Sequence, residues 1–205
     1  MIAVIDYKAG NLTSVMKAVR AAGADAQVTG DPDAIERAEK IILPGVGHFA
    51  ATELLRTSGM EAAIRRSVAR GVPFLGICVG LQWLFEGSTE APEIPGFAAF
   101  GGHCQRFSGP MKVPHVGWNS LRVREGSCLL AGVPDGAFVY YTHSYRAPVI
   151  NDTVAVTEYD GQFSGAVERG ALCGVQFHPE KSGETGLRVL RNFLALPSPR
   201  AVAAC

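Results

Sequence analysis

A cysteine with a glycine two residues away on each side stands in the segment Gly76-Ile77-Cys78-Val79-Gly80. The apolar run 72–77 before it is typical of a buried strand, and 79–85 has helical apolar spacing. A nucleophile at such a strand-to-helix turn is pushed out of the sheet, beside unpaired N–H groups of the new helix. These groups favour a thiolate and a developing oxyanion. We interpret Cys78 as a nucleophile; the alternative is a small apolar core residue.

A histidine and a glutamate about one hundred residues later supply what a reactive cysteine requires. Pro179 favours extended backbone at His178, and residues two apart in an extended chain point the same way, so Glu180 could orient the imidazole. A free cysteine, with a pKa of about 8.5, is mostly protonated at neutral pH, and a neighbouring imidazolium makes it a thiolate. The residues therefore predict a Cys78–His178–Glu180 triad. The alternative is a surface histidine without a catalytic role.

The composition is that of an ordinary globular protein. The chain has 205 residues, 47% of them hydrophobic and 19% charged, with a net charge of zero. This balance argues against general binding to nucleic acid or a membrane surface. The five cysteines are widely spaced singles without a CxxC pair, so we expect reduced thiols, no metal site and no cofactor. The N-terminal residues resemble a strand rather than a signal peptide, and we expect a cytoplasmic protein.

The apolar pattern predicts an α/β fold with a mostly parallel central sheet flanked by helices and an additional antiparallel or mixed β-rich half. In the first half we expect strands at 2–5, 26–29, 40–43 and 72–77 and helices at 12–22, 32–37 and 79–85. The segment 50–69 should hold one or two helices, broken near 58–59. In the second half we expect strands at 103–107, 116–123, 138–145, 153–159, 162–168 and 172–177 and a helix at 186–195. Residues 1–196 would form a single domain, and 197–205 would be a frayed tail.

A loop rich in glycine follows the third predicted strand, in the segment Pro44-Gly45-Val46-Gly47-His48. Right-handed crossovers place the loops after parallel strands at one carboxyl edge, where ligands bind in such sheets. Glycines there let the backbone approach a ligand closely. A tight turn without a ligand is the alternative.

These motifs resemble those of the class I, or triad, glutamine amidotransferases. GICVGLQ and GVQFHPEKSG carry the resemblance to the class. IDYKAGNLTSV, PGVGHF, KVPHVGWN and YTHSY resemble, more narrowly, the glutaminase subunits of imidazole glycerol phosphate synthases. The resemblance extends from residue 1 to about residue 196. Lys8 stands where a glycine is common in the family, and Val79 and Leu81 stand where Leu and Met are common.

The resemblance implies that Cys78 attacks the side-chain amide of glutamine, that His178 relays protons and that Glu180 orients the histidine. Ammonia then leaves, and the thioester is hydrolysed to glutamate. The resemblance also implies an oxyanion hole and a substrate pocket. The oxyanion donors would be the Val79 N–H and the backbone of Gly45, Val46 and Gly47. Substrate contacts would come from Gly47, Gln82, His143, Ser144 and Tyr145; the alternative for His143 is a strand residue without ligand contact.

The resemblance further implies a partner, because free ammonia in water is mostly ammonium, which cannot attack. The partner would be a cyclase subunit with a (β/α)8 barrel that receives ammonia through a tunnel and makes imidazole glycerol phosphate and AICAR in histidine biosynthesis. Interface positions would be Asn11, Val46, Trp118, Asn119 and Lys181. A buried Trp118 is the alternative to an interface anchor.

Two other functions remain open at this point. The chain could be the glutaminase of another synthase, such as one for anthranilate or pyridoxal phosphate. It could also be a noncatalytic module that senses redox state through the same thiol.

Overall fold

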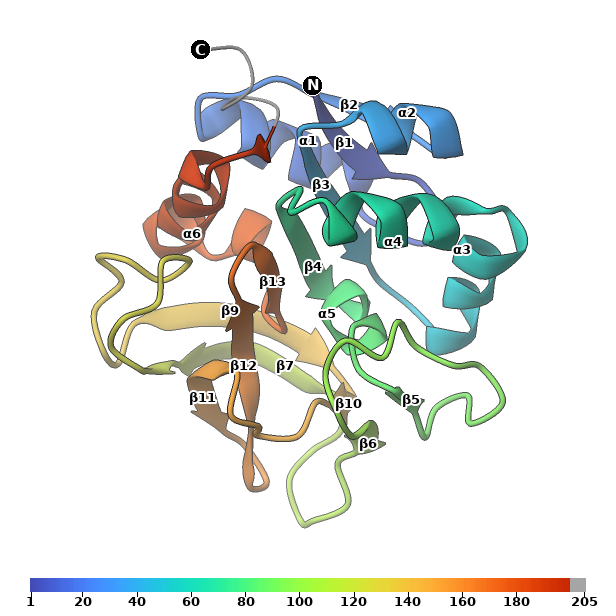
Figure 1. The fold of residues 1–205 in the computed structure, drawn as a ribbon. Coiled ribbons are helices and arrows are strands. Elements are labelled where there is room, and N and C mark those ends of the chain that lie inside the picture. The colour runs from blue at the N-terminus through green and yellow to red at the C-terminus, as the bar shows by residue number, and fades with distance from the viewer. Residues whose placement is uncertain (200–205) are drawn as a thin grey trace.

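An eight-stranded sheet runs through the computed structural model, which describes residues 1–199 (Figure 1). Its strands lie in the order β2-β1-β3-β4-β13-β12-β11-β8. The parallel part contains β2 (Ala26–Thr29), β1 (Ile2–Ile5), β3 (Lys40–Gly45), β4 (Phe74–Cys78) and β13 (Leu172–Val175). The antiparallel part contains β12 (Gln162–Arg169), β11 (Thr153–Glu158) and β8 (Arg122–Val123).

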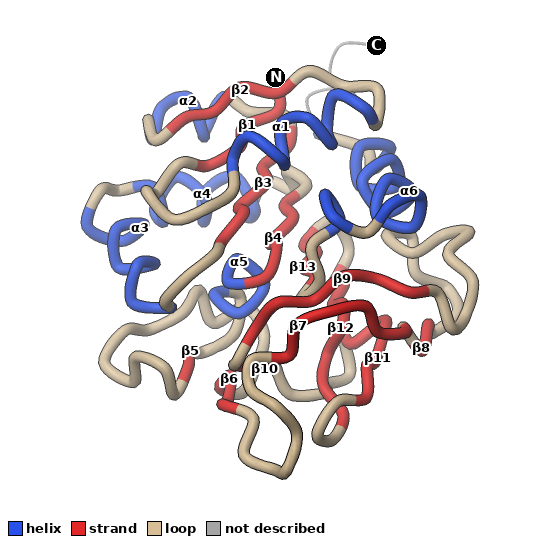
Figure 2. Tube along the Cα trace, turned by 180° about the vertical axis from the view of Figure 1, so that it is seen from behind, coloured by secondary structure: helices blue, strands red, loops and turns tan. Residues whose placement is uncertain are grey.

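Helices cover both faces of this sheet. One face carries α1 (Leu12–Ala21) and α6 (Gly183–Ala195), which lie toward the viewer in Figure 2. The other face carries α2 (Pro32–Arg37), α3 (Glu53–Thr57), α4 (Met60–Ala69) and α5 (Val79–Trp83) (Figure 1). A 3₁₀ helix, η1 (Phe49–Thr52), leads into α3. None of the helices within residues 1–199 has the length and apolar character needed to cross a bilayer.

Two small sheets complete the fold. One pairs β7 (His115–Ser120) with β9 (Phe138–His143) and lies on the same side of the molecule as α6 (Figure 2). The other has the order β10 (Tyr145–Arg146), β6 (His103–Arg106) and β5 (Gly87–Ser88).

The predicted fold class is confirmed, with differences in the second half. The β-rich half does not simply lie on the parallel sheet, because β13 continues that sheet into antiparallel strands. The predicted strand 116–123 is two strands in different sheets, since buried Leu121 separates β7 from β8 and bonds to Ala137 instead. The predicted strand 138–145 is likewise divided at Ser144, and β5 lies where no strand was predicted.

The predicted tail begins in contact with the domain. Ser198 is buried, and Cγ of Pro199 lies 3.4 Å from the position that a Cβ would occupy on Gly71. Residues 197–199 therefore pack against the parallel half rather than fray from it. The rest of the predicted tail, 200–205, lies outside the described residues.

Close backbone crossings fix the turn between β4 and α5. A Cβ on Gly80 would lie 2.0 Å from the carbonyl oxygen of Leu43 in β3, and one on Gly76 would lie 2.4 Å from the carbonyl oxygen of Gly80. No side chain fits at either position without moving backbone. The two glycines that flank Cys78 are thus required by the packing of α5 against the sheet.

We expect Gly80→Ala to lower the free energy of unfolding by about 1–3 kcal/mol, because the new methyl group must displace the backbone of β3. Urea unfolding followed by circular dichroism measures this change. Gly101→Ala is the matched control, since its Cβ would meet nothing within 4 Å, and it should change stability by less than about 0.5 kcal/mol. Equal stability of the two variants would contradict the expected crowding.

Candidate active site

Cys78 has a strained backbone. Its φ of 56° and ψ of −107° are unusual for a residue with a side chain, and it is both the last residue of β4 and the N-cap of α5. Such conformations cost about 1–3 kcal/mol and persist only where the surrounding structure holds them. Here the crowded glycine contacts supply that constraint, and the predicted strand-to-helix turn is confirmed.

His178 follows the strand next to the nucleophile strand. β13 pairs in parallel with β4, and Val175 aligns with Ile77. Both chains therefore leave the sheet at the same edge, one after Cys78 and the other into the segment 176–178. The backbone N–H of His178 donates to the Tyr140 carbonyl oxygen at 2.9 Å, which holds this segment under β9.

His178 and Glu180 form a buried pair. Nδ1 of His178 lies 2.9 Å from Oε1 of Glu180, and the two side chains are 1% and 2% exposed. The predicted route to this contact is wrong, because residues Pro179–Lys181 form a 3₁₀ helix, η2, rather than extended chain. The tight turn brings the carboxylate back to the imidazole over two residues.

The electrostatics of the pair favour an imidazolium. Burial acts to lower the pKa of His178, but the Cys78 thiol and the Glu180 carboxylate outweigh it and raise that pKa to about 10. Nε2 makes no hydrogen bond within residues 1–199, so this nitrogen is available to the nearby sulfur. Since the folded pKa exceeds the ordinary value of about 6.5, the resulting stabilisation is complete below pH 6.5 and is lost as the pH rises through about 10.

The sulfur of Cys78 has two polar neighbours in addition. It lies 4.0 Å from the carbonyl oxygen of Thr142 in β9, and Nε2 of Gln176 donates to it at 3.6 Å. Gln176 is fully buried. Sequence reasoning missed this residue, although it lies two positions before His178 and the same alternation that linked His178 with Glu180 could have indicated it.

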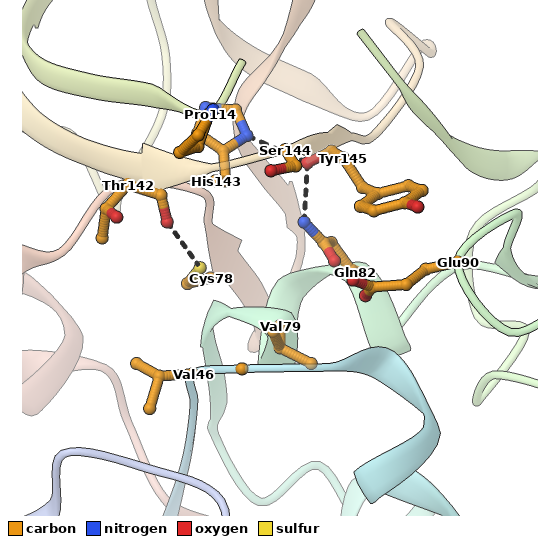
Figure 3. Close-up of a pocket in the computed structure, with 11 residues that line it drawn as sticks. Val46, Cys78, Val79, Gln82, Glu90, Pro114, Thr142, His143, Ser144 and Tyr145 are labelled. Atoms are coloured by element: carbon orange, nitrogen blue, oxygen red, sulfur yellow. Dashed lines mark hydrogen bonds between the residues drawn. The ribbon is translucent and has the colours of Figure 1, made fainter.

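A cavity of about 240 Å³ opens beside the sulfur (Figure 3). Its size suits a ligand as small as an amino acid. Seven of the predicted substrate and oxyanion residues line it together with Cys78 and with three residues that the sequence did not indicate. The predicted ones are Val46, Gly47, Val79, Gln82, His143, Ser144 and Tyr145, where Val46 and Val79 belong to the oxyanion group, and the others are Glu90, Pro114 and Thr142.

Glu90 ties the pocket wall to the glycine-rich loop. Its Oε2 accepts a hydrogen bond from the backbone N–H of Phe49 at 2.8 Å. Phe49 begins η1 directly after that loop. A carboxylate in the segment 86–102 carried no motif, which is why sequence reasoning did not single it out.

The amide of Gln82 has a fixed orientation. Nε2 donates to the Tyr145 carbonyl oxygen at 2.8 Å and to Oε1 of Gln176 at 3.2 Å. Because both of these neighbours are acceptors, Oε1 of Gln82 is the atom left to accept hydrogen bonds in the cavity (Figure 3).

Comparison with known sequences assigns the family. A sequence model described as "Glutamine amidotransferase class-I" matches residues 3–196. The chain belongs to this family. Similar curated proteins carry the name imidazole glycerol phosphate synthase subunit HisH. One from Thermococcus kodakarensis is 47% identical over 96% of this chain and all of its own length. One from Moorella thermoacetica is 47% identical (94% and 93% covered), and one from Geobacillus kaustophilus is 44% identical (98% and 99% covered).

Solved structures agree on the fold of this glutamine amidotransferase. A structure described as a glutamine amidotransferase has a TM-score of 0.76 at 20% identity and covers 96% of this chain and 98% of its own. PurLQS from Thermotoga maritima has a TM-score of 0.71 at 21% identity, with 94% and 96% covered. At these identities the likeness concerns the fold alone.

The candidate oxyanion donors of the amidotransferase are not equivalent in position. Val79, whose N–H is the first after the nucleophile, lines the cavity with Val46 and Gly47. Gly45 does not line it, because this residue is the end of β3 and pairs with Cys78 in the sheet. A Cβ on Gly45 would lie 2.5 Å from the Tyr7 hydroxyl, so this glycine is needed for packing instead.

Of the predicted interface residues, Val46 lines the cavity and the other four lie outside it. Trp118 in β7 is 56% exposed, which excludes a buried core role, and it packs edge-on against Tyr140. Lys181 is exposed with Nζ 5.7 Å from the centre of the same ring. Asn11 caps α1 by accepting from the Ser14 N–H, so it has a structural role in any case.

We expect Glu180→Gln to lower the pKa of His178 by roughly 1–3 pH units, because this variant lacks the negative charge that favours the imidazolium. The imidazole resonances of His178, followed by NMR against pH, measure this pKa. Glu184→Gln is the control, since it removes the same charge from an exposed position in α6. Identical His178 titrations in the two variants would refute the role of Glu180.

Acid should destabilise the protein through two other histidines. Burial lowers the pKa of His143 to about 3 and that of His115 to about 4. Both values lie below the ordinary 6.5, so the unfolded chain binds more protons and stability falls as the pH drops below 6.5. We expect each histidine to contribute a loss of about 2 kcal/mol between pH 7 and 5, measured by urea unfolding. The loss should be smaller in His115→Asn, and an equal loss in that variant would contradict this origin.

Proposed function

We propose that this chain is the glutaminase subunit of imidazole glycerol phosphate synthase. It hydrolyses glutamine to glutamate and ammonia and passes the ammonia to a cyclase subunit in histidine biosynthesis. The observation that carries the proposal is the strained Cys78 beside the buried His178–Glu180 pair, at the wall of a cavity of amino-acid size. Support for this subfamily comes from relatives at 43–47% identity with that name over most of the chain.

The first half of the reaction forms a thioester. The Cys78 sulfur attacks the side-chain amide carbon of glutamine, and the carbonyl oxygen becomes an oxyanion that accepts from the Val79 N–H. The second donor comes from the backbone of Val46 or Gly47. The imidazolium of His178 gives its Nε2 proton to the amide nitrogen, the C–N bond breaks and ammonia leaves.

The second half restores the enzyme. His178, now neutral, takes a proton from water, and the resulting hydroxide attacks the thioester carbon. The oxyanion forms again in the same hole, the C–S bond breaks and glutamate leaves with Cys78 as the thiolate. Glu180 holds Nδ1 of the imidazole throughout, so that Nε2 always faces the reacting atoms.

The cavity supplies the contacts for glutamine. Oε1 of Gln82 accepts from the substrate, and the segment 143–145 and Glu90 also line the cavity. A carboxylate such as that of Glu90 suits the α-ammonium group of an amino acid.

The partner surface is the exposed face of the β7–β9 sheet. Val116, Trp118 and Phe138 are 56%, 56% and 59% exposed, and the cation of Lys181 lies beside them over Tyr140. Exposed aromatic and apolar side chains with a charged rim are typical of a protein interface. We propose that a (β/α)8-barrel cyclase subunit binds here, near Asn119 and the α1 end with Asn11, to form a heterodimer in the cytoplasm. The proposal includes no nucleic-acid or membrane partner.

We expect Cys78→Ser to reduce glutamine hydrolysis by at least about 10³-fold, because a serine hydroxyl is not ionised by this histidine. Glutamate production, measured with glutamate dehydrogenase, gives the rate. Cys128→Ser, which alters an exposed thiol elsewhere, is the control and should retain full activity. Activity of Cys78→Ser equal to that of the control would reject the nucleophile.

The subunit assignment has its own test. Addition of a barrel cyclase subunit with its nucleotide ligand should strongly stimulate glutamine hydrolysis, and Trp118→Ala should weaken the complex. Hydrolysis that a cyclase leaves unchanged, but that an anthranilate or pyridoxal phosphate synthase partner stimulates, would move the chain to another subfamily. If glutamine does not protect Cys78 from alkylation, that result would favour the noncatalytic thiol module.

A further inference from the structure

Two histidines that the triad does not use connect the β7–β9 sheet to the pocket. Nδ1 of His115 lies 3.0 Å from Nε2 of His143, and Nδ1 of His143 lies 2.9 Å from the carbonyl oxygen of Tyr145. His115 is stacked between two tyrosine rings, with centroid distances of 4.9 Å to Tyr141 and 3.9 Å to Tyr159. The cluster is thus held rigidly in the core.

The hydrogen positions of this pair follow from its neighbours. A carbonyl oxygen only accepts, so Nδ1 of His143 must carry the hydrogen. Since burial keeps both rings neutral, Nε2 of His143 accepts from Nδ1 of His115, and Nε2 of His115 must in turn accept. The donor is Nδ2 of Asn119 at 3.4 Å.

Asn119 is itself oriented by the backbone. Its Nδ2 also donates to the carbonyl oxygen of Glu158 at 3.0 Å, and its Oδ1 accepts from the N–H of Ser120 at 2.8 Å. The orientation of every group from β7 to the pocket is therefore determined by fixed backbone atoms.

The Tyr145 carbonyl oxygen connects these oriented groups to the residues around the nucleophile. It accepts from His143 and from Nε2 of Gln82, whose second bond goes to Oε1 of Gln176. The same constraint turns Nε2 of Gln176 toward the sulfur of Cys78. Without the Gln82 bond, the Gln176 amide could rotate and present its oxygen to the sulfur.

We propose that these bonds form one orienting chain from Asn119 to Cys78, and that Gln176 and His115 are its positioning residues. Gln176 directs an N–H donor at the sulfur, and a donor favours the charged form of its acceptor. His115 holds the outer part of the chain by donating to Nε2 of His143, which keeps that ring oriented toward the Tyr145 carbonyl oxygen. The outer end lies in β7, next to the exposed Trp118.

Thiol alkylation tests this role separately from the glutaminase chemistry on which the proposal rests, because it requires neither glutamine nor a partner. The full chain is used with Cys128 and Cys205 replaced by serine, while Cys104 and Cys173 are buried and their pKa values are raised by burial. The rate of iodoacetamide reaction at Cys78 is measured by mass spectrometry from pH 6 to 9.

We expect Gln176→Met to slow alkylation at pH 7 about tenfold and to move the midpoint of the pH profile upward by about one pH unit, because the sulfur loses its donor. His178, Glu180 and Tyr7, the other titratable groups near the sulfur, are unchanged in this variant. Gln176→Glu still accepts from Gln82 but offers the sulfur no donor, so it should shift the profile in the same direction. It also serves as the test if Gln176→Met does not fold.

The outer part of the chain is tested with two variants of His115 that match each other in size. Asparagine places an N–H near the position of Nδ1 and should preserve the profile of Cys78, whereas leucine has no donor and should slow alkylation two- to threefold. Tyr141→Phe is the control, because it removes a buried hydrogen bond to Thr157 from the same cluster without touching the chain. It should lower the thermal midpoint and leave the alkylation profile unchanged.

Superimposable profiles for wild type and both Gln176 variants would overturn the proposal. So would equal rates for His115→Asn and His115→Leu, or a shift in Tyr141→Phe as large as that in His115→Leu, since these results would indicate a general loss of packing.

Discussion

The parallel pairing of β4 with β13 is the constraint on which the site depends. Ile77 and Val175 are in register, so the next residues of both strands, Cys78 and Gln176, reach the carboxyl edge together. β3 adds Gly45 at the same level on the other side of β4. A shift of one residue in either pairing would turn the side chains of that strand to the opposite face. The register of these strands therefore places the nucleophile, its histidine and its oxyanion loop at one edge of the sheet, although they are far apart in the sequence.

The sequence could predict the features that are written in local patterns. The glycines around Cys78, the apolar strands of the first half and the His178–Pro179–Glu180 segment all have local physical causes. The strand bounds of the second half were less accurate, because the division between β7 and β8 depends on Leu121, which bonds to Ala137 and belongs to neither strand. That choice is made by tertiary packing and leaves no periodic signal.

The residues of the pocket likewise divide into those that a local sequence pattern indicates and those that only tertiary contacts place. Gln82 could be placed from its helical spacing relative to Cys78, but Glu90 and His115 come from segments without periodicity. Their roles follow from contacts to Phe49 and His143, over 41 and 28 positions of the chain. The contact of Glu180 with His178 was predicted correctly from an incorrect backbone, since η2 replaces the extended chain. The turn of η2 brings the carboxylate to the imidazole in place of the expected alternation.

The crowding of glycines behind Cys78 has a consequence for protein engineering. The strand-to-helix turn leaves no room for a methyl group at Gly45, Gly76 or Gly80, so a library that varies these positions would consist mostly of misfolded proteins. Ser144 and Tyr145 also line the cavity and are not part of this turn. Attempts to redirect the enzyme to other amides should therefore diversify Ser144 and Tyr145 and keep the turn intact.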